Sequence, residues 1–441
     1  MLPESYITGA ISTADRVTNM HQEAWDGSVF KYMPIGHVPV TGILDAMGKV
    51  ATPSRHIHWW EEPFQKQRGS IIEVYTTNPL GLSPTAYATG GVAGNVVYLT
   101  MLADDARQII PGNTLLIQDP DTYEFLSLDV ISTTIGDDAS TYVSAALLSD
   151  DDEDVLAATT PYFTISSTAY EELSGLPEPQ GRDLVEFQNQ TQILMGALEV
   201  SGTEIEEDSR IDEGILPAEQ RRGLMRLMTQ AEWTSMFGVY KTKTGPKGKP
   251  RRFARGVVTA LKENVPQNFF NFKTDTATAI NGKTFKNGGW DYLKYIMDQT
   301  QKWDTGAGRV ELFLGMLSWR AINDLVEDRG HYQIVTQQSG FGIEVRTLYG
   351  LQKPVNLILH PLFSENPMFE RCGWLTQMGL MKIRPMRNRD ITYIPGDRKD
   401  PNGYVWVDGV KAGWMAEWTF QYSGLSSMAW ISGFGVDNIN P

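Results

Sequence analysis

Cysteine is almost absent from this sequence of 441 residues. Cys372 is the single one, which excludes an intrachain disulfide framework and a cysteine-rich zinc site. Long apolar runs are also missing, since no stretch of 18 apolar residues occurs, and residues 1–6 have neither the basic nor the apolar region of a signal peptide. We therefore expect a protein that neither spans a membrane nor is secreted by a signal peptide, and whose stability comes from packing.

Positive charge is scarce as well. The chain has 38 Lys and Arg residues and 53 Asp and Glu residues, which gives a net charge of −15 and a pI near 4.9. This balance argues against a dedicated nucleic-acid binder, because neutralising a polyanion requires excess Lys and Arg on the contacting face. The chain does have 41% hydrophobic residues, with 12 Trp, 17 Tyr and 17 Phe, so it is folded, and its length suggests about two to four domains.

The first third of the chain divides into an arm and a strand-rich insertion. Residues 1–50 are punctuated by Gly and Pro and predict an extended arm that lies on another surface. From Arg55 the pattern becomes that of a strand, with His56, His58 and Trp60 on one face and the alternating residues on the other. Short strands separated by turn residues then predict a compact all-β unit, at 96–101, 114–118, 125–132, 142–148 and 162–167.

A second extended stretch, residues 187–202, follows this unit. We expect it to run back along the strand near Arg55, so that a long two-stranded excursion carries the β unit. A hairpin of that length is only marginally stable alone, which predicts that it rests on a partner.

The strongest helix signal covers residues 217–240. Pro217 suits a first helical position, and the carboxylates that precede it, at 204–213, complement the positive end of the helix dipole. Two further helices are expected around 290–300 and from a Ser318 cap through Val326, interleaved with strands at 309–314 and 355–360 in a mixed unit over about 251–375. The tail returns to strands, with a hairpin around Asp408-Gly409 and strict alternation over 414–422.

A search for catalytic chemistry gives little. His56 and His58 share a strand face that could hold a metal, but no third His is nearby, so interface or packing histidines are the default interpretation. Glu61 and Glu62 point to opposite faces of a strand, which does not suit the facing carboxylates of glycoside hydrolysis. The segment 282–284 resembles the end of a phosphate-binding loop without its first glycine. No pattern requires a cofactor or a metal.

One basic cluster stands out. Residues 241–255 contain seven Lys and Arg and no acid, and the candidate contact residues in it are Lys247, Lys249, Arg251 and Arg252. It is either a solvated loop or a patch for an acidic surface, which could be a nucleic acid or carboxylates such as Glu206 and Glu207 of a neighbour. Unlike patches on one sequence favour head-to-tail contacts between copies, with Arg55, Trp59 and Trp60 as further candidates.

The order of these elements resembles the tailed-bacteriophage major capsid proteins, in the branch whose extended loop carries a small inserted β-barrel. The resemblance covers nearly the whole chain and is specific in order rather than in any single residue. It is carried by residues 40–49 leading into the strand at 55–60, by 188–193 and 198–203, by 251–258 after the long helix, by Leu314-Gly315 and by the closing strand at 417–420.

The resemblance implies an α+β fold with the parts of that family. These are an N-terminal arm (1–50), an extended loop (51–203) with the barrel at about 96–168, a peripheral domain (204–250 with a spine helix at 217–240, and 376–441) and an axial domain (251–375). It implies hexamers and pentamers that form an icosahedral shell around double-stranded DNA, in a virion assembled in the host cytoplasm. Implied partners are scaffolding, portal and decoration proteins and non-specifically contacted DNA, with no membrane and no enzymatic activity.

Two other classes of protein remain open at this point. A phage tail or decoration protein would share the β-rich composition, although it would not need a long helix followed by an α+β domain. A glycan hydrolase would need facing carboxylates, and Glu61 or Glu62 would then be essential.

Overall fold

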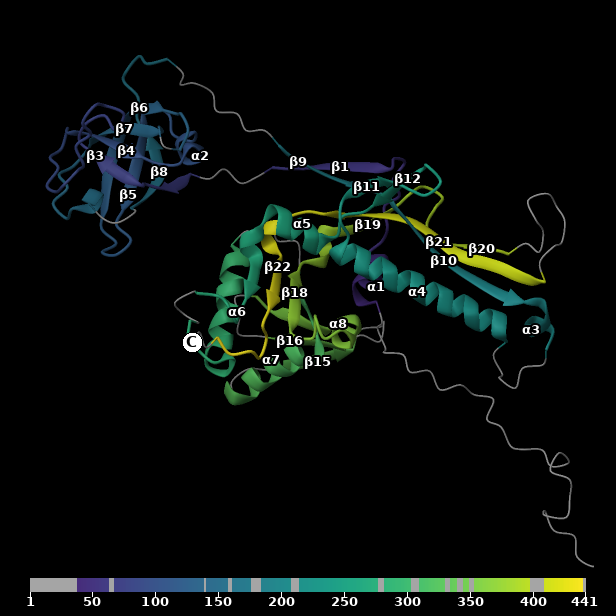
Figure 1. The fold of residues 1–441 in the computed structure, drawn as a ribbon. Coiled ribbons are helices and arrows are strands. Elements are labelled where there is room, and N and C mark those ends of the chain that lie inside the picture. The colour runs from purple at the N-terminus through teal and green to yellow at the C-terminus, as the bar shows by residue number, and fades with distance from the viewer. Residues whose placement is uncertain are drawn as a thin grey trace, which may run out of the picture. The chain divides into compact units, whose positions relative to one another are not determined.

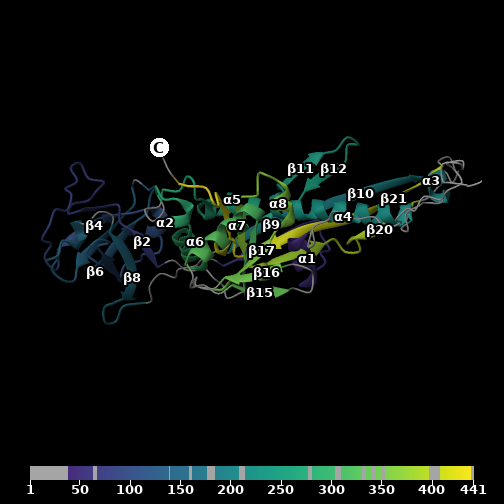
Figure 2. The same cartoon turned by 90° about the horizontal axis from the view of Figure 1, so that it is seen from below.

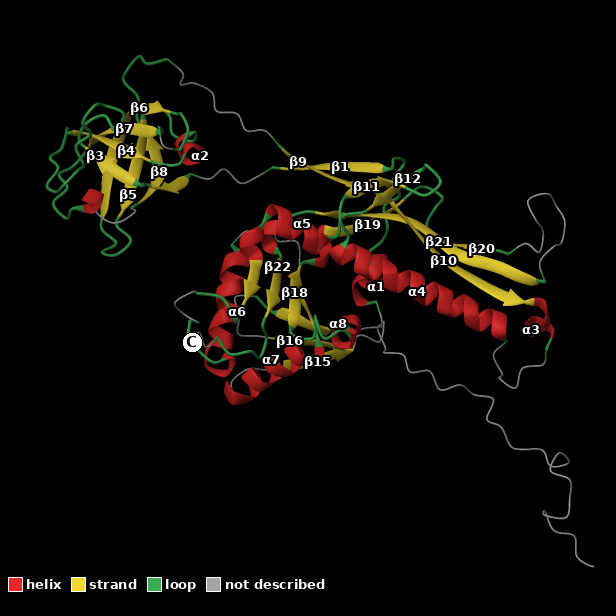
Figure 3. Ribbon diagram, in the orientation of Figure 1, coloured by secondary structure: helices red, strands yellow, loops and turns green. Residues whose placement is uncertain are grey.

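The computed structural model describes most of the chain in two compact units, residues 1–59 with 186–441 and residues 60–185. The described residues are 38–62, 67–138, 140–157, 161–175, 184–207, 214–276, 281–302, 309–329, 334–338, 344–348, 353–396 and 408–438. Figure 1 shows the course of the chain, and Figure 3 shows its helices and strands in separate colours.

The unit at 60–185 is built from strands. Seven of them form one antiparallel sheet in the order β2-β8-β5-β6-β7-β4-β3. Inward residues of these strands, such as Leu115, Leu128 and Phe163, make a hydrophobic core that contains only residues of this unit. The elements are β2 (Arg68–Ser70), β3 (Glu73–Tyr75), β4 (Val96–Thr100), α2 (Ala103–Ala106), β5 (Asn113–Gln118), β6 (Phe125–Thr134), β7 (Tyr142–Leu147), a 3-10 turn (Val155–Ala157) and β8 (Tyr162–Thr168).

The five strands expected in this unit are confirmed as β4 to β8, because alternation and turn residues are strong local signals. Two short strands, β2 and β3, precede them and were not predicted. They occupy the two ends of the sheet order. The chain reaches and leaves the unit through β1 (His56–Glu61) and β9 (Val185–Gln190), which pair with each other as expected.

The larger unit contains a long ribbon packed on the longest helix. Strand β10 (Gln192–Ser201) pairs antiparallel with β21 (Gly409–Tyr422), which also pairs with β19 (Met381–Pro385) and β20 (Thr392–Ile394). Helix α4 (Ile215–Phe237) lies along β10 and β21, as Figures 1 and 2 both show. The approach is close, since a Cβ on Gly196 would lie 3.2 Å from the carbonyl oxygen of Gly223. The predicted helix is thus confirmed, but it begins at Ile215, two residues before Pro217, and ends at Phe237 rather than Tyr240.

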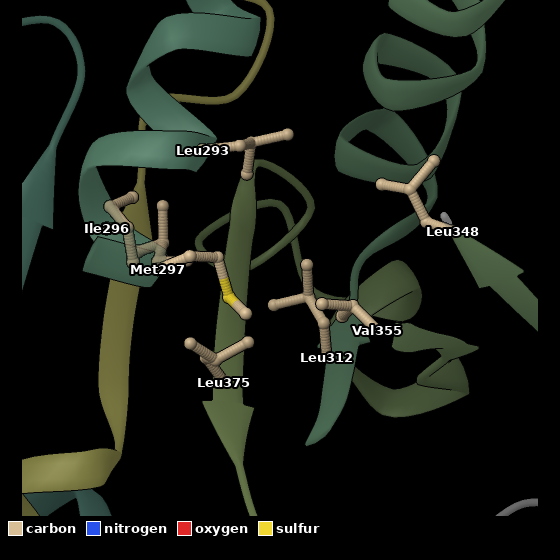
Figure 4. Close-up of a pocket in the computed structure, with 8 residues that line it drawn as sticks. Leu293, Ile296, Met297, Leu312, Leu348, Val355 and Leu375 are labelled. Atoms are coloured by element: carbon tan, nitrogen blue, oxygen red, sulfur yellow. The ribbon is translucent and has the colours of Figure 1, made fainter. Parts of the chain in front are cut away.

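A mixed seven-stranded sheet forms the second layer of this unit, in the order β13-β22-β18-β14-β17-β16-β15. Helices α6 and α7 pack on it through Trp290, Ile296 and Ile322. Figure 4 shows α6 side chains directed at the sheet around a small apolar cavity of about 10 Å³. The bounds are β13 (Phe269–Asn271), α6 (Phe285–Gln301), β14 (Val310–Leu314), α7 (Met316–Arg329), β15 (Ile334–Gln338), β16 (Glu344–Leu348), β17 (Val355–Leu359), α8 (Pro361–Glu365), β18 (Cys372–Thr376) and β22 (Ala429–Ser432).

Short elements connect these layers. They are α1 (Pro39–Ala46), α3 (Gly202–Glu206), β11 (Lys241–Thr244), β12 (Pro250–Phe253), α5 (Val257–Asn264) and 3-10 turns at Pro266–Asn268, Met378–Leu380 and Leu425–Ser427. One core cluster joins α1, α4, α5, β19 and β21 through residues such as Leu44, Leu227 and Trp418.

Two local expectations were wrong. Part of the predicted extended arm is helix α1, which buries Val40 and Leu44 against α4. Tertiary packing overrides the unfavourable Gly42 in its interior, while Pro39 stands at the first helical position, which suits proline. Ser318 is not a cap but lies inside α7, where its hydroxyl donates to the carbonyl oxygens of Glu370 and Cys372. Residues 1–37, and the first strand of the hairpin expected around Asp408, lie outside the described residues.

Candidate functional site

The basic cluster forms an antiparallel hairpin of β11 and β12, here named the cationic hairpin (residues 241–255). Lys243 lies opposite Arg251 across the two strands, and Thr242 lies opposite Arg252. The backbone N–H of Gly245 donates to the carbonyl oxygen of Lys249 at 2.7 Å and closes the turn. Strand pairing therefore gathers the cations of both strands on one short ribbon.

A buried glutamine holds the base of the cationic hairpin. Gln190, 1% exposed, donates through its Nε2 to the carbonyl oxygens of Lys241 (2.9 Å) and Phe253 (3.0 Å). Its Oε1 accepts from the hydroxyl of Thr242 at 2.9 Å. Because every polar atom of this amide is used, the hairpin leaves β9 in a fixed direction.

The tip of the cationic hairpin is charged and open to solvent. Lys243, Lys247, Lys249 and Arg251 are all exposed, and none of them forms an ion pair within the part of the chain that the structure describes. Arg255 differs, since its Nε lies 3.3 Å from a carboxylate oxygen of Glu263. Exposed cations without an ion-pair partner among the described residues are available to an external anion.

The positive charges of Arg55 and Arg252 both affect the imidazole of His56. The pKa of His56 is lowered by burial and then by the positive charges of Arg55 and Arg252. The carbonyl oxygen of Arg55 accepts the N–H of Thr191, which ties the start of β1 to the end of β9. Strand β1 thus adds Arg55 to the electrostatic neighbourhood of the hairpin, which joins two candidates that are far apart in sequence.

The two tryptophans of β1 have opposite environments. Trp59 is 6% exposed, stacks on Phe187 with ring centroids 6.0 Å apart, and meets Tyr422 edge-on at 5.3 Å. Its side chain is therefore part of this chain's own core rather than a surface contact. Trp60 points to the other face and is 61% exposed.

The acidic candidates lie on and just after α3. Glu206 ends this helix, Glu207 follows it, and both are exposed. In Figures 1 and 2 α3 sits at the far end of the β10–β21 ribbon from the cationic hairpin. The structure therefore does not bring the two oppositely charged patches together within one chain. Asp208, Asp212 and Glu213 of the acidic segment lie outside the described residues.

The histidines of β1 do not form a metal centre in the structure. The Nδ1 of His58 lies 2.6 Å from Oε1 of Glu186 on β9, so this pair bridges the two connecting strands. Among the described residues, no three His, Cys, Asp or Glu side chains group closely enough to hold a metal ion. No described helix is long and apolar enough to cross a membrane.

Sequence reasoning missed the buried polar residues that position these surfaces. Gln190 sits in a stretch expected to be extended and is 1% exposed, and Glu232 sits on α4 with no exposed surface. A polar residue inside an otherwise apolar stripe is the one signal that sequence offers for such groups, and it does not name the partner.

A shell-building protein is the class that these features fit: separate core-bearing units, an insertion on paired strands, and complementary charged patches that cannot meet within one chain. A protein-family model described as SU10 major capsid protein matches residues 10–406. The chain belongs to this family, and it is therefore a major capsid protein, the structural subunit of a phage head.

Solved structures with similar folds include those from Mycobacterium phage Cain (11% identity, 98% of this chain and 100% of that chain, TM-score 0.46) and Mycobacterium phage Bobi (8% identity, 96% and 99%, TM-score 0.44). Another is the holo-SrpI encapsulin complex from Synechococcus elongatus (11% identity, 58% and 79%, TM-score 0.38). No curated protein matches the chain. The assignment rests on the family model.

Proposed function

We propose that the parts of the fold take the capsid roles that the sequence suggested. Residues 1–50 are the N-terminal arm and 51–203 the extended loop, with the β unit at about 96–168 as its inserted barrel. Residues 204–250 and 376–441 are the peripheral domain, and 251–375 the axial domain. The core within 60–185 contains residues of the β unit alone, and the core around α6 and α7 is drawn mainly from 251–375, which supports these two parts. The core around α4 and β21 instead joins the arm, the loop and both other domains.

The contacts between subunits run from the cationic hairpin of one copy to the acidic α3 region of the next. Residues 241–255 carry seven cations and no acid, and residues 199–213 carry seven acids and one Arg. Opposite charges at two distant places on one chain favour a head-to-tail contact, which closes into rings when the rotation between copies closes. The residues assigned to this contact are Lys247, Lys249, Arg251, Arg252, Glu206 and Glu207, and Arg55 and Trp60 are further candidates for contacts between subunits.

Further partners follow from the shell role. Scaffolding, portal and decoration proteins take part in assembly, which takes place in the host cytoplasm, and packaged double-stranded DNA is contacted without sequence preference. The net charge of −15 supports weak contact with DNA, because tight non-specific binding needs many Lys and Arg on one face. Tight binding of duplex DNA by the purified subunit at physiological salt would contradict this part of the proposal.

Charge reversal tests the contact between subunits. Lys247→Glu with Arg251→Glu, in the full chain, is expected to prevent closed particles and capsomers, as seen by light scattering and negative-stain microscopy. Glu206→Lys with Glu207→Lys should do the same alone, whereas combining all four changes should restore assembly, because the attraction returns with its sign exchanged. Exposed sites make misfolding a minor concern, and Lys382→Glu, on exposed β19 surface, is the control. Normal assembly by both double variants would overturn the proposed contact.

A further inference from the structure

Two aromatic rings stand exposed on one face of the sheet in the β unit (residues 60–185), on either side of Gln118. Strand β5 lies between β6 and β8 (Figure 1), and Gln118 of β5 pairs in register with Phe125 of β6 and with Tyr162 of β8. The next row along these strands is buried and consists of Leu126, Ile117 and Phe163. Because successive side chains of a strand point to opposite faces, the first row points away from the core. Phe125 is 63% exposed and Tyr162 is 54% exposed.

A third ring, Tyr123, is held next to this row in a strained backbone conformation. It lies in the turn between β5 and β6, is 70% exposed, and its carbonyl oxygen accepts from Nε2 of Gln118 at 3.4 Å. Its φ of 63° lies in the left-handed region, where Gly or Asn is usual and a bulky residue is rare. Asp119 fixes the turn, since its carboxylate accepts the backbone N–H of Asp121 at 2.9 Å and the hydroxyl of Thr122 at 2.8 Å. Glycine would suit this position better, so the stability of the fold does not explain the ring.

Hydrogen-bonding groups are interleaved with these rings. The neighbouring row on the same face is joined by strand pairing and by the N–H of Leu148, which donates to the carbonyl oxygen of Ser127, and it consists of Leu148, Ser127, Leu116 and Thr164. The amide of Gln118 and the hydroxyls of Ser127 and Thr164 can each donate and accept. Flat rings beside short polar side chains suit a sugar, because its C–H faces stack on rings while its hydroxyls need donors and acceptors.

The area of this face is too small for a stable contact with another protein. It consists of two rows of residues about 7 Å apart, which extend over three strand spacings of about 4.8 Å each. A specific protein contact buries roughly 800 Å² on each partner. The face therefore suits a small or narrow ligand better than a folded partner or a second copy of this chain.

Charge excludes an anionic ligand and does not select a cationic one. Residues 60–185 contain 4 Lys and Arg against 20 Asp and Glu, a net charge of −16. Two of these acids, Asp121 and Glu124, are exposed in the same turn as Tyr123. The unit therefore repels nucleic acids and acidic glycans. A cationic ligand would be attracted anywhere on the unit, so that attraction does not account for three rings at one end of the sheet.

We propose that Tyr123, Phe125 and Tyr162 form a stacking surface for an uncharged glycan. Gln118 and Thr164 lie in the same two rows and bond the hydroxyls of the sugar. The site belongs to one unit of one chain, so it does not depend on the proposed shell role.

Affinity electrophoresis of the purified full chain tests the site, in native gels that contain one of the neutral polysaccharides dextran, laminarin or galactomannan. We expect at least one of them to retard the unchanged chain. Phe125→Thr with Tyr162→Thr should weaken this binding by about tenfold or more for each ring, because threonine suits a strand but removes the stacking. Tyr170→Ser removes an exposed ring beyond the other end of β8 and is the control, which should bind like the unchanged chain. No retardation by any of the three, or retardation that survives the double variant, would overturn the proposal.

Tyr123→Gly separates binding from stability. Glycine adopts a positive φ without strain, so the midpoint of urea unfolding should be unchanged or higher while the affinity for the polysaccharide falls. Lower stability with unchanged affinity would show that the ring serves the fold, and would overturn its place in the site. Light scattering provides the remaining test. A dimer of the unchanged chain that the double variant abolishes, and that bound polysaccharide leaves intact, would assign this face to a second copy and overturn the proposal.

Discussion

The Nε2 of His360 lies 3.0 Å from Oε1 of Glu232, and neither side chain has exposed surface. The same carboxylate accepts the backbone N–H groups of Val40 at 2.9 Å and Thr41 at 2.8 Å. Helix α1 has no side-chain cap of its own at Val38, so Glu232 of α4 caps it from outside. One acid thus joins α1, α4 and the residue after β17.

Replacing this acid should loosen the attachment of α1. In Glu232→Gln an amide NH₂ takes the place of one acceptor oxygen, so at least one buried donor loses its partner, at a cost of roughly 1–3 kcal/mol of unfolding free energy. Urea unfolding of purified subunits measures this loss of unfolding free energy. Gln230→Ala, exposed on the same helix, is the control and should change stability by less than about 0.5 kcal/mol. Equal stability of the two variants would contradict the capping role of Glu232.

Glu311 on β14 should make stability depend on pH. Burial raises the pKa of its carboxyl from 4.5 to about 7, although its Oε2 accepts the N–H of Met378 at 3.2 Å. Below pH 4.5 the group is protonated in both folded and unfolded chains, and above pH 7 it is ionised in both. Between these values the folded chain holds the proton more tightly, so stability falls as pH rises.

Glu311→Gln removes that ionisation. The variant should be more stable than the unchanged chain by roughly 1–3 kcal/mol above pH 7 and nearly equal to it below pH 4.5, in unfolding curves taken across this range. Glu365→Gln, an exposed carboxyl on α8, serves as the control and should leave the pH profile in place. A profile that Glu311→Gln leaves unchanged would show that burial does not perturb this carboxyl.

How far the sequence predicted this fold depended on the kind of signal. Strand β1 was predictable because alternation alone decides its faces, and Ile57 and Trp59 are indeed the buried ones. Helix α4 was predictable from its spacing, although Pro217 marked its start two residues too late. Helix α1 was not, because Gly42 disfavours the interior of so short a helix, while burial of Leu44 and the distant Glu232 stabilise it.

The candidate contact residues show the same limit. The basic cluster at 241–255 could be found from composition, since a run of cations without acids is visible in the sequence, but its pairing into a hairpin was not predicted. The contacts that bury Trp59 could not be predicted, because its neighbours Phe187 and Tyr422 come from strands 128 and 363 positions later. The net charge of the whole chain, −15, also conceals that residues 60–185 carry −16 and the remaining residues +1. This difference becomes visible only when the boundaries of the units are known.

Deleting the β unit tests its independence. A chain in which residues 62–184 are replaced by a short Gly-Ser linker should keep a folded body, because the cores around α4 and α6 contain no residue of the unit. Circular dichroism and cooperative unfolding would show the fold. We expect this chain to fail to close particles, since the extended loop no longer reaches a neighbour. An unfolded deletion chain, with the unchanged chain folded, would contradict the independence of the body.

Filling the small cavity between α6 and the sheet should stabilise the body. It is lined by aliphatic side chains and Met297, with room for about one methyl group (Figure 4). Val355→Ile adds a methylene there and should gain up to about 1 kcal/mol in urea unfolding. Val310→Ile is the matched control, since Val310 pairs with Val355 in register but does not line the cavity. It should lose about 1–3 kcal/mol through overpacking. Equal effects would contradict the cavity.

The paired strands β1 and β9 make the ends of the 126-residue insertion neighbours, about 4.8 Å apart, the spacing of adjacent strands. For the folding of the rest of the chain, the insertion is therefore equivalent to a closed loop, whatever residues it contains. A foreign domain with adjacent termini could be grafted at this junction and leave the body folded, so the junction separates the folding of the body from what the insertion contributes to closing particles.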